Sequence, residues 1–251
     1  MADPRVRIQL CGRVCAEIDG TRRETRLPGP QGRRMFAFLV LRRMDAISRA
    51  DLHDALWGDH PPASPEPAVS ALLSRLRTAL APVGLAGLRL VLPPGAWVDI
   101  EAAREAIHRS ESAAAQQDWG RAWGAAQITL FAARRGFLPG DDLPWIEAVR
   151  RELDTLRIRA LETYALSALN LAGTELATAE RSARELVERA PFRESGYRVL
   201  MQALAAGGNT AEALMVYDQL VRLLGDELGV APSPPTRELH ARLLRPETAT
   251  G

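Results

Sequence analysis

The chain has 251 residues, a formal net charge of +1 and 47% hydrophobic residues, and this apolar content excludes a wholly disordered protein. No apolar run reaches the roughly 18 residues of a membrane span, and no apolar stretch follows Arg5 and Arg7, so we expect neither a membrane segment nor a secretion signal. Cys11 and Cys15 fit neither a disulfide framework nor a zinc pattern, which is typical of a cytoplasmic protein.

The charge is divided unevenly along the chain. All 32 cationic residues are arginine. Residues 1–100 hold 14 arginines against 10 acidic residues, a formal charge of +4, whereas residues 101–251 hold 18 against 21, a charge of −3. A basic first part is expected of a domain that faces nucleic acid.

The first thirty residues predict a small antiparallel sheet. Residues 6–10 alternate apolar and polar side chains, residues 14–18 do so loosely, and residues 23–27 complete the sheet. The pair Asp19-Gly20 is a favoured hairpin turn. Pro28-Gly29-Pro30 ends the strand pattern.

Three helices follow, over residues 31–43, 48–58 and 64–80. Ser48 and Asp51 predict a capping box, and Ser64 is expected to cap the third helix. The third helix has an apolar stripe of Val69, Leu72, Leu73, Leu76 and Leu80. Residues 88–92 and 96–100 then predict a hairpin around Pro93-Pro94-Gly95. This order is that of a winged helix-turn-helix domain, whose third helix enters the major groove of DNA.

Residues 101–251 lack strand signals. Helices are predicted at residues 101–116, 119–133, 143–172, 175–190, 194–206, 210–224 and 235–244. Ala179, Leu186 and Val187 recur 34 residues later as Ala213, Leu220 and Val221. This period is that of tetratricopeptide repeats, which stack into concave surfaces for protein partners. The predicted fold is therefore mainly α with a small β part: a winged helix over residues 1–100 and an all-α, tetratricopeptide-like domain over residues 101–251.

Several motifs together resemble the short form of the SARP family, the Streptomyces antibiotic regulatory proteins. In the first domain they are Ser48-Arg49-Ala50-Asp51-Leu52, Ala55-Leu56-Trp57-Gly58, Ser74-Arg75-Leu76-Arg77 and Pro93-Pro94-Gly95. In the second they are Ala213-Leu214 with Tyr217, and Asp226-Glu227-Leu228-Gly229-Val230. The first domain resembles the OmpR-type winged helix, and the second resembles the bacterial transcriptional activation domain.

The resemblance implies a DNA-binding activator. Such a protein binds direct repeats in double-stranded promoter DNA, with two copies forming a homodimer on the DNA. It recruits RNA polymerase through the sigma factor and core subunits, often at antibiotic biosynthesis genes, and is cytoplasmic and nucleoid-associated. The implied DNA-binding residues are Ser70, Ser74, Arg75, Arg77, Thr78, Arg33, Arg34 and Trp97. Arginine reads guanine or holds phosphate, and serine bonds either.

The sequence departs from the family pattern at Glu66, Pro67, Thr78 and Leu92, where basic, amide or lysine residues are usual. An alternative is therefore a non-enzymatic interaction regulator of the same fold with weakened or lost DNA binding. A third reading is a small-molecule sensor with a pocket in the helical domain. Further arginines are either backbone contacts or ordinary surface: Arg22, Arg23, Arg26, Arg42 and Arg43.

Nothing in the sequence predicts catalysis. His53, His60, His108 and His240 are scattered, without carboxylate or cysteine partners at metal-ligand spacing. The chain has no nucleophile elbow, phosphate-binding loop or dinucleotide fingerprint. We therefore expect no enzyme activity, no metal and no cofactor.

Overall fold

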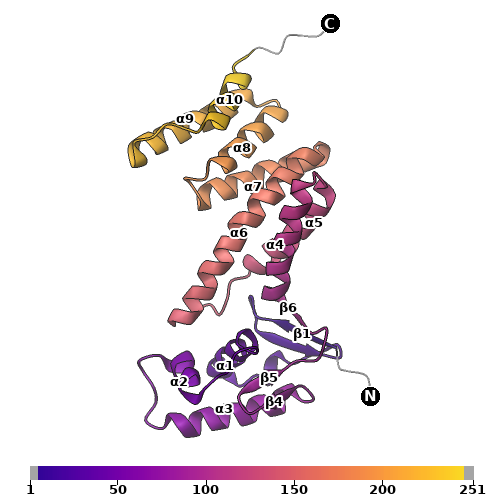
Figure 1. The fold of residues 1–251 in the computed structure, drawn as a ribbon, viewed down its shortest axis with the longest axis vertical. Helices are drawn as coiled ribbons and strands as arrows, with labels where there is room; N and C mark the ends of the chain where they lie inside the picture. Colours follow the sequence, from indigo (N-terminus) through magenta and orange to yellow (C-terminus); the bar gives the residue numbers. More distant parts are fainter. Residues whose placement is uncertain (1–4, 246–251) are drawn as a thin grey trace. The chain divides into compact units, whose positions relative to one another are not determined.

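The computed structural model describes residues 5–245. Two compact units are present in the chain. The first consists of Met1–Ala103 and Ala132–Asp154, and the second of Arg104–Phe131 and Thr155–Gly251. The fold is mainly α with a small β part, as predicted, with a winged helix-turn-helix followed by tetratricopeptide-like helices (Figure 1).

A four-stranded sheet of order β3-β2-β1-β6 opens the first unit. Its strands are β1 Val6–Gln9, β2 Cys15–Ile18, β3 Thr21–Arg22 and β6 Trp97–Val98. Strand β1 runs antiparallel to β2 and parallel to β6. The turn predicted at Asp19-Gly20 is confirmed, since both residues have positive φ, 51° and 77°.

The predicted third strand over residues 23–27 is wrong. The two-residue turn pairs Thr21 with Ile18 at once, so β3 is complete at Arg22. The Arg23 N–H still donates to the Ala16 carbonyl at 2.8 Å, and the chain then forms a short 3₁₀ helix, η1 Glu24–Arg26.

The three predicted helices are α1 Gly29–Leu41, α2 Arg49–Trp57 and α3 Pro65–Leu80. The capping box is confirmed: Ser48 Oγ accepts from the Asp51 N–H at 3.1 Å, and Asp51 accepts from the Ser48 N–H at 2.7 Å. Ser64 occupies the N-cap position of α3, as predicted, but its side chain makes no capping hydrogen bond. Helix α3 begins at Pro65, which is tolerated at the first helical position because it has no N–H to satisfy.

The wing lies earlier in the chain than predicted. Strands β4 Gly84–Ala86 and β5 Arg89–Val91 pair antiparallel around Gly87, which has φ of 63°. Pro93-Pro94-Gly95 therefore does not form the hairpin turn. It leads the chain into β6, which pairs with β1, because burial of Val98 in the sheet core favours that position over a solvent-exposed hairpin arm.

The core of the first unit joins its three helices to residues 132–154. Met35, Phe36, Leu39, Leu52, Leu56 and Leu76 are all fully buried. Trp145 packs edge-on against Phe38 and Phe137, with ring centroids 5.4 and 5.8 Å apart. The Trp145 indole N–H donates to the Ala55 carbonyl at 3.0 Å, which attaches residues 132–154 to α2.

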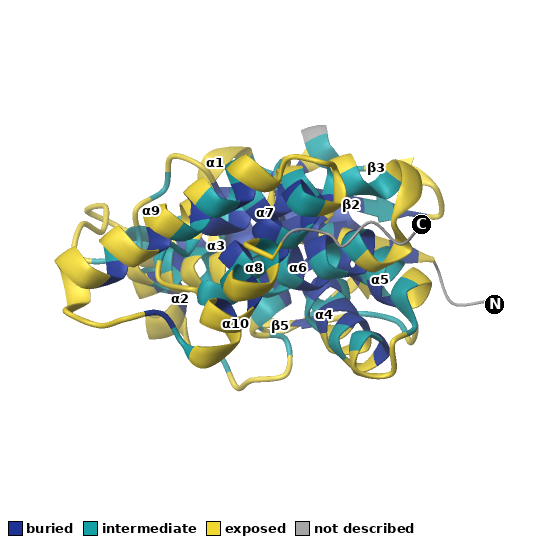
Figure 2. Cartoon of the chain, turned by 90° about the horizontal axis from the view of Figure 1, so that it is seen from above, coloured by how far each residue is buried: buried dark blue, intermediate teal, exposed yellow. Residues whose placement is uncertain are grey.

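The remaining helices are α4 Asp99–Ala115, α5 Trp119–Ala133, α6 Pro144–Leu171, α7 Leu176–Arg189, α8 Glu194–Ala206, α9 Thr210–Leu228 and α10 Pro234–Leu243. The short 3₁₀ helix η2 Gly173–Glu175 precedes α7. Helix α9 ends four residues beyond its predicted end at 224, where Gly229 closes it in the left-handed conformation with φ of 68°. The helices are buried along one side and exposed along the other (Figure 2).

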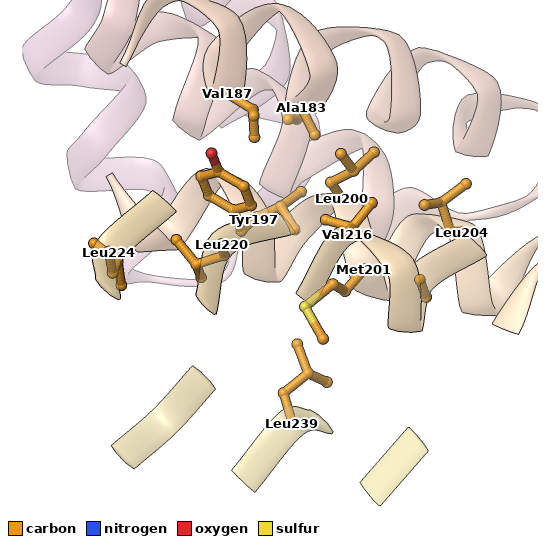
Figure 3. Close-up of a cluster of buried hydrophobic side chains, with 13 residues drawn as sticks. Ala183, Val187, Tyr197, Leu200, Met201, Leu204, Val216, Leu220, Leu224 and Leu239 are labelled. Atoms are coloured by element: carbon orange, nitrogen blue, oxygen red, sulfur yellow. The ribbon is translucent and has the colours of Figure 1, made fainter. Parts of the chain in front are cut away.

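In the second unit, α7, α8, α9 and α10 share one hydrophobic cluster (Figure 3). Tyr197, Leu200 and Met201 of α8 lie at its centre, and Leu220 of α9 packs against them. Ala179 and Ala213, which define the 34-residue period, are both fully buried, as close helix packing requires. Tyr217 of α9 stacks on His240 of α10 with ring centroids 3.7 Å apart.

Candidate nucleic-acid interface

Helix α3 has one buried face and one polar exposed face. The predicted apolar stripe of Val69, Leu72, Leu73, Leu76 and Leu80 is buried. Ser70, Ser74, Arg75, Arg77 and Thr78 are all exposed. The helix that the DNA-binding prediction requires at the surface is therefore at the surface, with serine, threonine and arginine side chains outward.

Two of these side chains have contacts within the first unit. Arg77 donates from Nη2 to the Gly87 carbonyl at 3.0 Å, which fastens the tip of the wing to α3. Thr78 Oγ1 donates to the Ser74 carbonyl one turn earlier at 3.2 Å. Helix α3 and the wing are thus held together by a direct hydrogen bond.

A basic hollow of about 700 Å³ lies between α3 and the start of α1. It is lined by Arg26, Ser74, Arg75 and Thr78, with residues 27–29 forming the opposite wall. Nearby, Arg23 donates from Nη1 to the Ala79 carbonyl at 3.3 Å. Two guanidinium groups and two hydroxyls around one hollow have the hydrogen-bonding character that suits a phosphate group.

The other end of α3 carries a charge cluster. Glu66 accepts from Arg49 Nη1 at 2.8 Å, and His53 Nε2 lies 3.3 Å from its other carboxylate oxygen. Arg49 Nη1 also lies 3.3 Å from Ser70 Oγ. Arg49 and His53 belong to α2, so this cluster links the N-terminal halves of the two helices.

The structure gives Arg34 a role different from the predicted DNA contact. Its side chain is only 17% exposed, forms an ion pair with Asp141 and donates to the Leu56 carbonyl. Because its guanidinium is used inside the first unit, Arg34 is not an available phosphate ligand. Arg33, one residue earlier, lines a separate hollow of about 500 Å³ beside Gly140.

Trp97 also lies away from its predicted place in the wing. It belongs to β6, where it pairs with Arg7 of β1, and the Arg7 guanidinium sits 4.7 Å from the centre of its ring. The ring therefore stacks under a cation in the sheet. The wing itself presents Arg89, which donates to the Arg43 carbonyl at 3.1 Å.

The described residues, 5–245, contain no group of three or more His, Cys, Asp or Glu side chains that could hold a metal ion. In the same range no helix has the length and apolar character needed to cross a bilayer. Cys11 and Cys15 are buried free thiols, and burial raises the pKa of Cys11 far above its ordinary value.

Comparison with known proteins decides the family. Residues 98–244 match the model of the bacterial transcriptional activator domain. The chain belongs to the SARP family of transcriptional regulators, whose members carry this domain. It is 35% identical over 250 residues to the regulatory protein AfsR of Streptomyces coelicolor. The matched region covers 97% of this chain and 25% of AfsR. The SARP chain therefore spans about a quarter of that relative's length.

Two further relatives are similar over nearly the whole SARP chain. It is 28% identical over 257 residues to the regulatory protein DnrI of Streptomyces peucetius, covering 96% of this chain and 92% of DnrI. A solved structure of Mycobacterium tuberculosis EmbR in complex with a low-affinity phosphopeptide has a TM-score of 0.78 at 23% identity. It covers 97% of this chain and 66% of the EmbR chain, and it supports the fold.

Sequence reasoning missed two features of this SARP-family site. The sequence indicated for Arg26 only a backbone contact or an ordinary surface position, whereas in the structure it lines the same hollow as Arg75. The pairing of Arg49 with Glu66 was not foreseen, because 17 residues and a loop separate them. The sequence did offer a signal for this pair, because opposite charges stand at the starts of two successive helices.

Proposed function

We propose that the chain is a DNA-binding transcriptional activator that binds direct repeats in promoter DNA and recruits RNA polymerase to secondary-metabolite genes. The single observation that carries the proposal is the exposed polar face of α3, with Arg75 beside the hollow that Arg26 also lines. A helix of this kind contacts base edges in the major groove, while flanking arginines hold the phosphate backbone. The similarity to AfsR and DnrI, both regulatory proteins, supports the same conclusion.

Phosphate contacts make the affinity for DNA depend on salt concentration in a predictable way. Each neutralised phosphate contributes about −0.9 to the slope of log K against log salt concentration. Raising the salt fourfold therefore weakens binding roughly 3.5-fold for every contact. If Arg75 holds a phosphate, Arg75→Ala lowers this slope by about one, and the loss of affinity is the same on every sequence.

The test is a gel-shift titration with the full chain on promoter fragments from its own gene neighbourhood, at several salt concentrations, followed by footprinting. We expect a protected direct repeat, bound more weakly by Arg75→Ala. Arg109→Ala is the matched control, because Arg109 is also exposed but lies on α4. If the wild-type chain protects no fragment at low salt, or Arg109→Ala and Arg75→Ala bind alike, the proposal is refuted.

Recruitment of RNA polymerase needs a second measurement. Transcription in vitro from the protected promoter, with purified polymerase holoenzyme from the native host, should rise when the full chain is added. A chain that occupies the repeat without raising transcription contradicts the activator part of the proposal and leaves DNA binding in place.

A second candidate is an interaction regulator with weak DNA binding of its own. The observation that favours it is that Arg34, Arg43 and Arg49 are engaged in ion pairs with Asp141, Glu101 and Glu66, which reduces the positive charge presented to DNA. Genome-wide binding in the native host separates the two candidates. Sharp peaks that persist without any second regulator exclude this one.

A further inference from the structure

The charge cluster at the start of α3 has a defined geometry. Glu66 lies in the first turn of the helix, and its carboxylate is held from α2 by Arg49 at 2.8 Å and approached by His53 at 3.3 Å. The Glu66 side chain nevertheless remains 56% exposed. A carboxylate held by the Arg49 hydrogen bond but still open to solvent has lone pairs available for a ligand.

The first turn of α3 is unsuited to binding phosphate. Pro65 and Pro67 have no backbone N–H, so two of the donors that a helix N-terminus normally offers to an anion are missing. The negative charge of Glu66 occupies the same turn. An incoming duplex therefore meets an acceptor at this point of the helix, where most helix N-termini present donors.

Base edges in the major groove differ in what they offer such an acceptor. Cytosine presents only its N4 amino group, a donor, whereas guanine and thymine present acceptors and adenine places its N7 acceptor beside the amino group. A carboxylate is repelled by those acceptors and is matched by cytosine alone. Arg49 lies next to Glu66, and a guanidinium has five N–H donors of the kind that match the O6 and N7 acceptors of the guanine paired with such a cytosine.

We propose that Glu66 is a specificity-determining residue that accepts a hydrogen bond from the N4 amino group of a cytosine, with Arg49 holding its carboxylate in place. This inference rests on the proposed DNA binding by α3. Its consequence is that the acidic residue at the start of the recognition helix selects one base pair of the operator rather than weakening binding uniformly.

The experiment is a binding-site selection from randomised duplexes with the full wild-type chain and with Glu66→Gln. Affinities are then measured on the selected site with each of the four bases at every position. We expect the wild-type chain to prefer cytosine at one position by roughly 5- to 150-fold, the range of a good side chain–base pair. In Glu66→Gln this preference is lost or moves to adenine, which glutamine bonds through N6 and N7.

Two variants separate base reading from charge and from folding. Glu105→Gln removes the same charge from an exposed position on α4 and should keep the cytosine preference. Glu66→Asp keeps the charge but withdraws the carboxylate by one methylene, so it should weaken the cytosine preference even if Glu66→Gln folds poorly. Thermal unfolding of each variant establishes that the fold is intact.

The outcomes are distinct. If Glu66→Gln tightens binding to every sequence by one factor and leaves all base preferences unchanged, Glu66 is only a counter-charge and this inference fails while the proposed function stands. Retention of the cytosine preference at full strength by Glu66→Asp also overturns it. If the wild-type chain selects no sequence at all, the proposed function fails first.

Discussion

Asp99 is a buried, charged residue of the first unit that accepts several backbone hydrogen bonds, and Asp99→Asn tests its contribution with little change in side-chain volume. The residue is only 4% exposed. One oxygen accepts from the N–H groups of Leu10 and Ile100 at 2.9 Å, and the other accepts from Cys11 at 2.9 Å and from Leu10 at 3.0 Å. These bonds tie the end of β1 to the start of α4.

The expected cost of Asp99→Asn follows from this geometry. The amide keeps one acceptor oxygen and places an NH₂ group where the second oxygen was, so at least one buried N–H loses its acceptor, at about 1–3 kcal/mol. Burial raises the pKa of Asp99, although the hydrogen bonds from Cys11, Leu10 and Ile100 act in the opposite direction. Because the buried charge already carries a desolvation cost that the amide avoids, we expect a net loss of about 2 kcal/mol, below the 3–5 kcal/mol of a broken buried ion pair.

The assay is urea unfolding followed by tryptophan fluorescence, in a background with Trp119→Phe and Trp123→Phe. The remaining tryptophans, Trp57, Trp97 and Trp145, all belong to the unit that contains Asp99. With a slope of about 2 kcal/mol per molar urea, the midpoint should fall by about 1 M. The control is Asp59→Asn, at an exposed loop position. Equal midpoints for Asp59→Asn and Asp99→Asn would refute the reasoning.

Three further outcomes are expected. Ser48→Ala removes the acceptor of the capping box and should lower the free energy of unfolding by about 1 kcal/mol, measured by urea titration, whereas Ser48→Thr, which keeps the hydroxyl, should retain most of it. Met201→Ala, at a fully buried position of α8, should cost about 2–5 kcal/mol and lower the melting temperature, and an unchanged melting temperature would contradict the packing described. Burial acts to raise the pKa of Glu194, but hydrogen bonds from Ser233 and Thr236 outweigh it, and the net shift is downward from 4.5. The stability that Glu194 contributes is therefore present above pH 4.5 and lost as the pH falls through its lowered pKa, so stability curves of wild type and Glu194→Gln should converge in acid; parallel curves would argue against this.

The local elements of the chain were largely predictable because the forces that form them act over a few residues. The spacing of Val69, Leu72 and Leu76 predicted the buried face of α3, and the Ser48–Asp51 pair predicted the start of α2. The helices over residues 119–133 and 194–206 have the predicted bounds. The family resemblance, carried by motifs spread over both halves of the chain, agrees with the match to the bacterial transcriptional activator domain.

The wing was predicted in the wrong place because a short strand can pair with more than one partner. Residues 97–98 have strand character in either of two places, a hairpin arm or an added strand beside β1, and local sequence does not distinguish them. The choice depends on burying Val98 against a sheet formed some 90 residues earlier. Because residues 97–98 pair with β1, the wing is formed by residues 84–91, and the Trp97 ring lies under the Arg7 guanidinium.

The sequence by itself determined the helices, the order of the two kinds of fold and which face of α3 is polar, because helix periodicity and capping are written in neighbouring residues. Only the tertiary structure decided which arginines are available to a ligand. Arg34 and Arg75 look equivalent in the sequence, yet one is paired inside the first unit with Asp141, 107 residues away, and the other lies exposed on α3. A long charged side chain takes whichever partner the fold brings within reach, and that partner can lie anywhere in the chain.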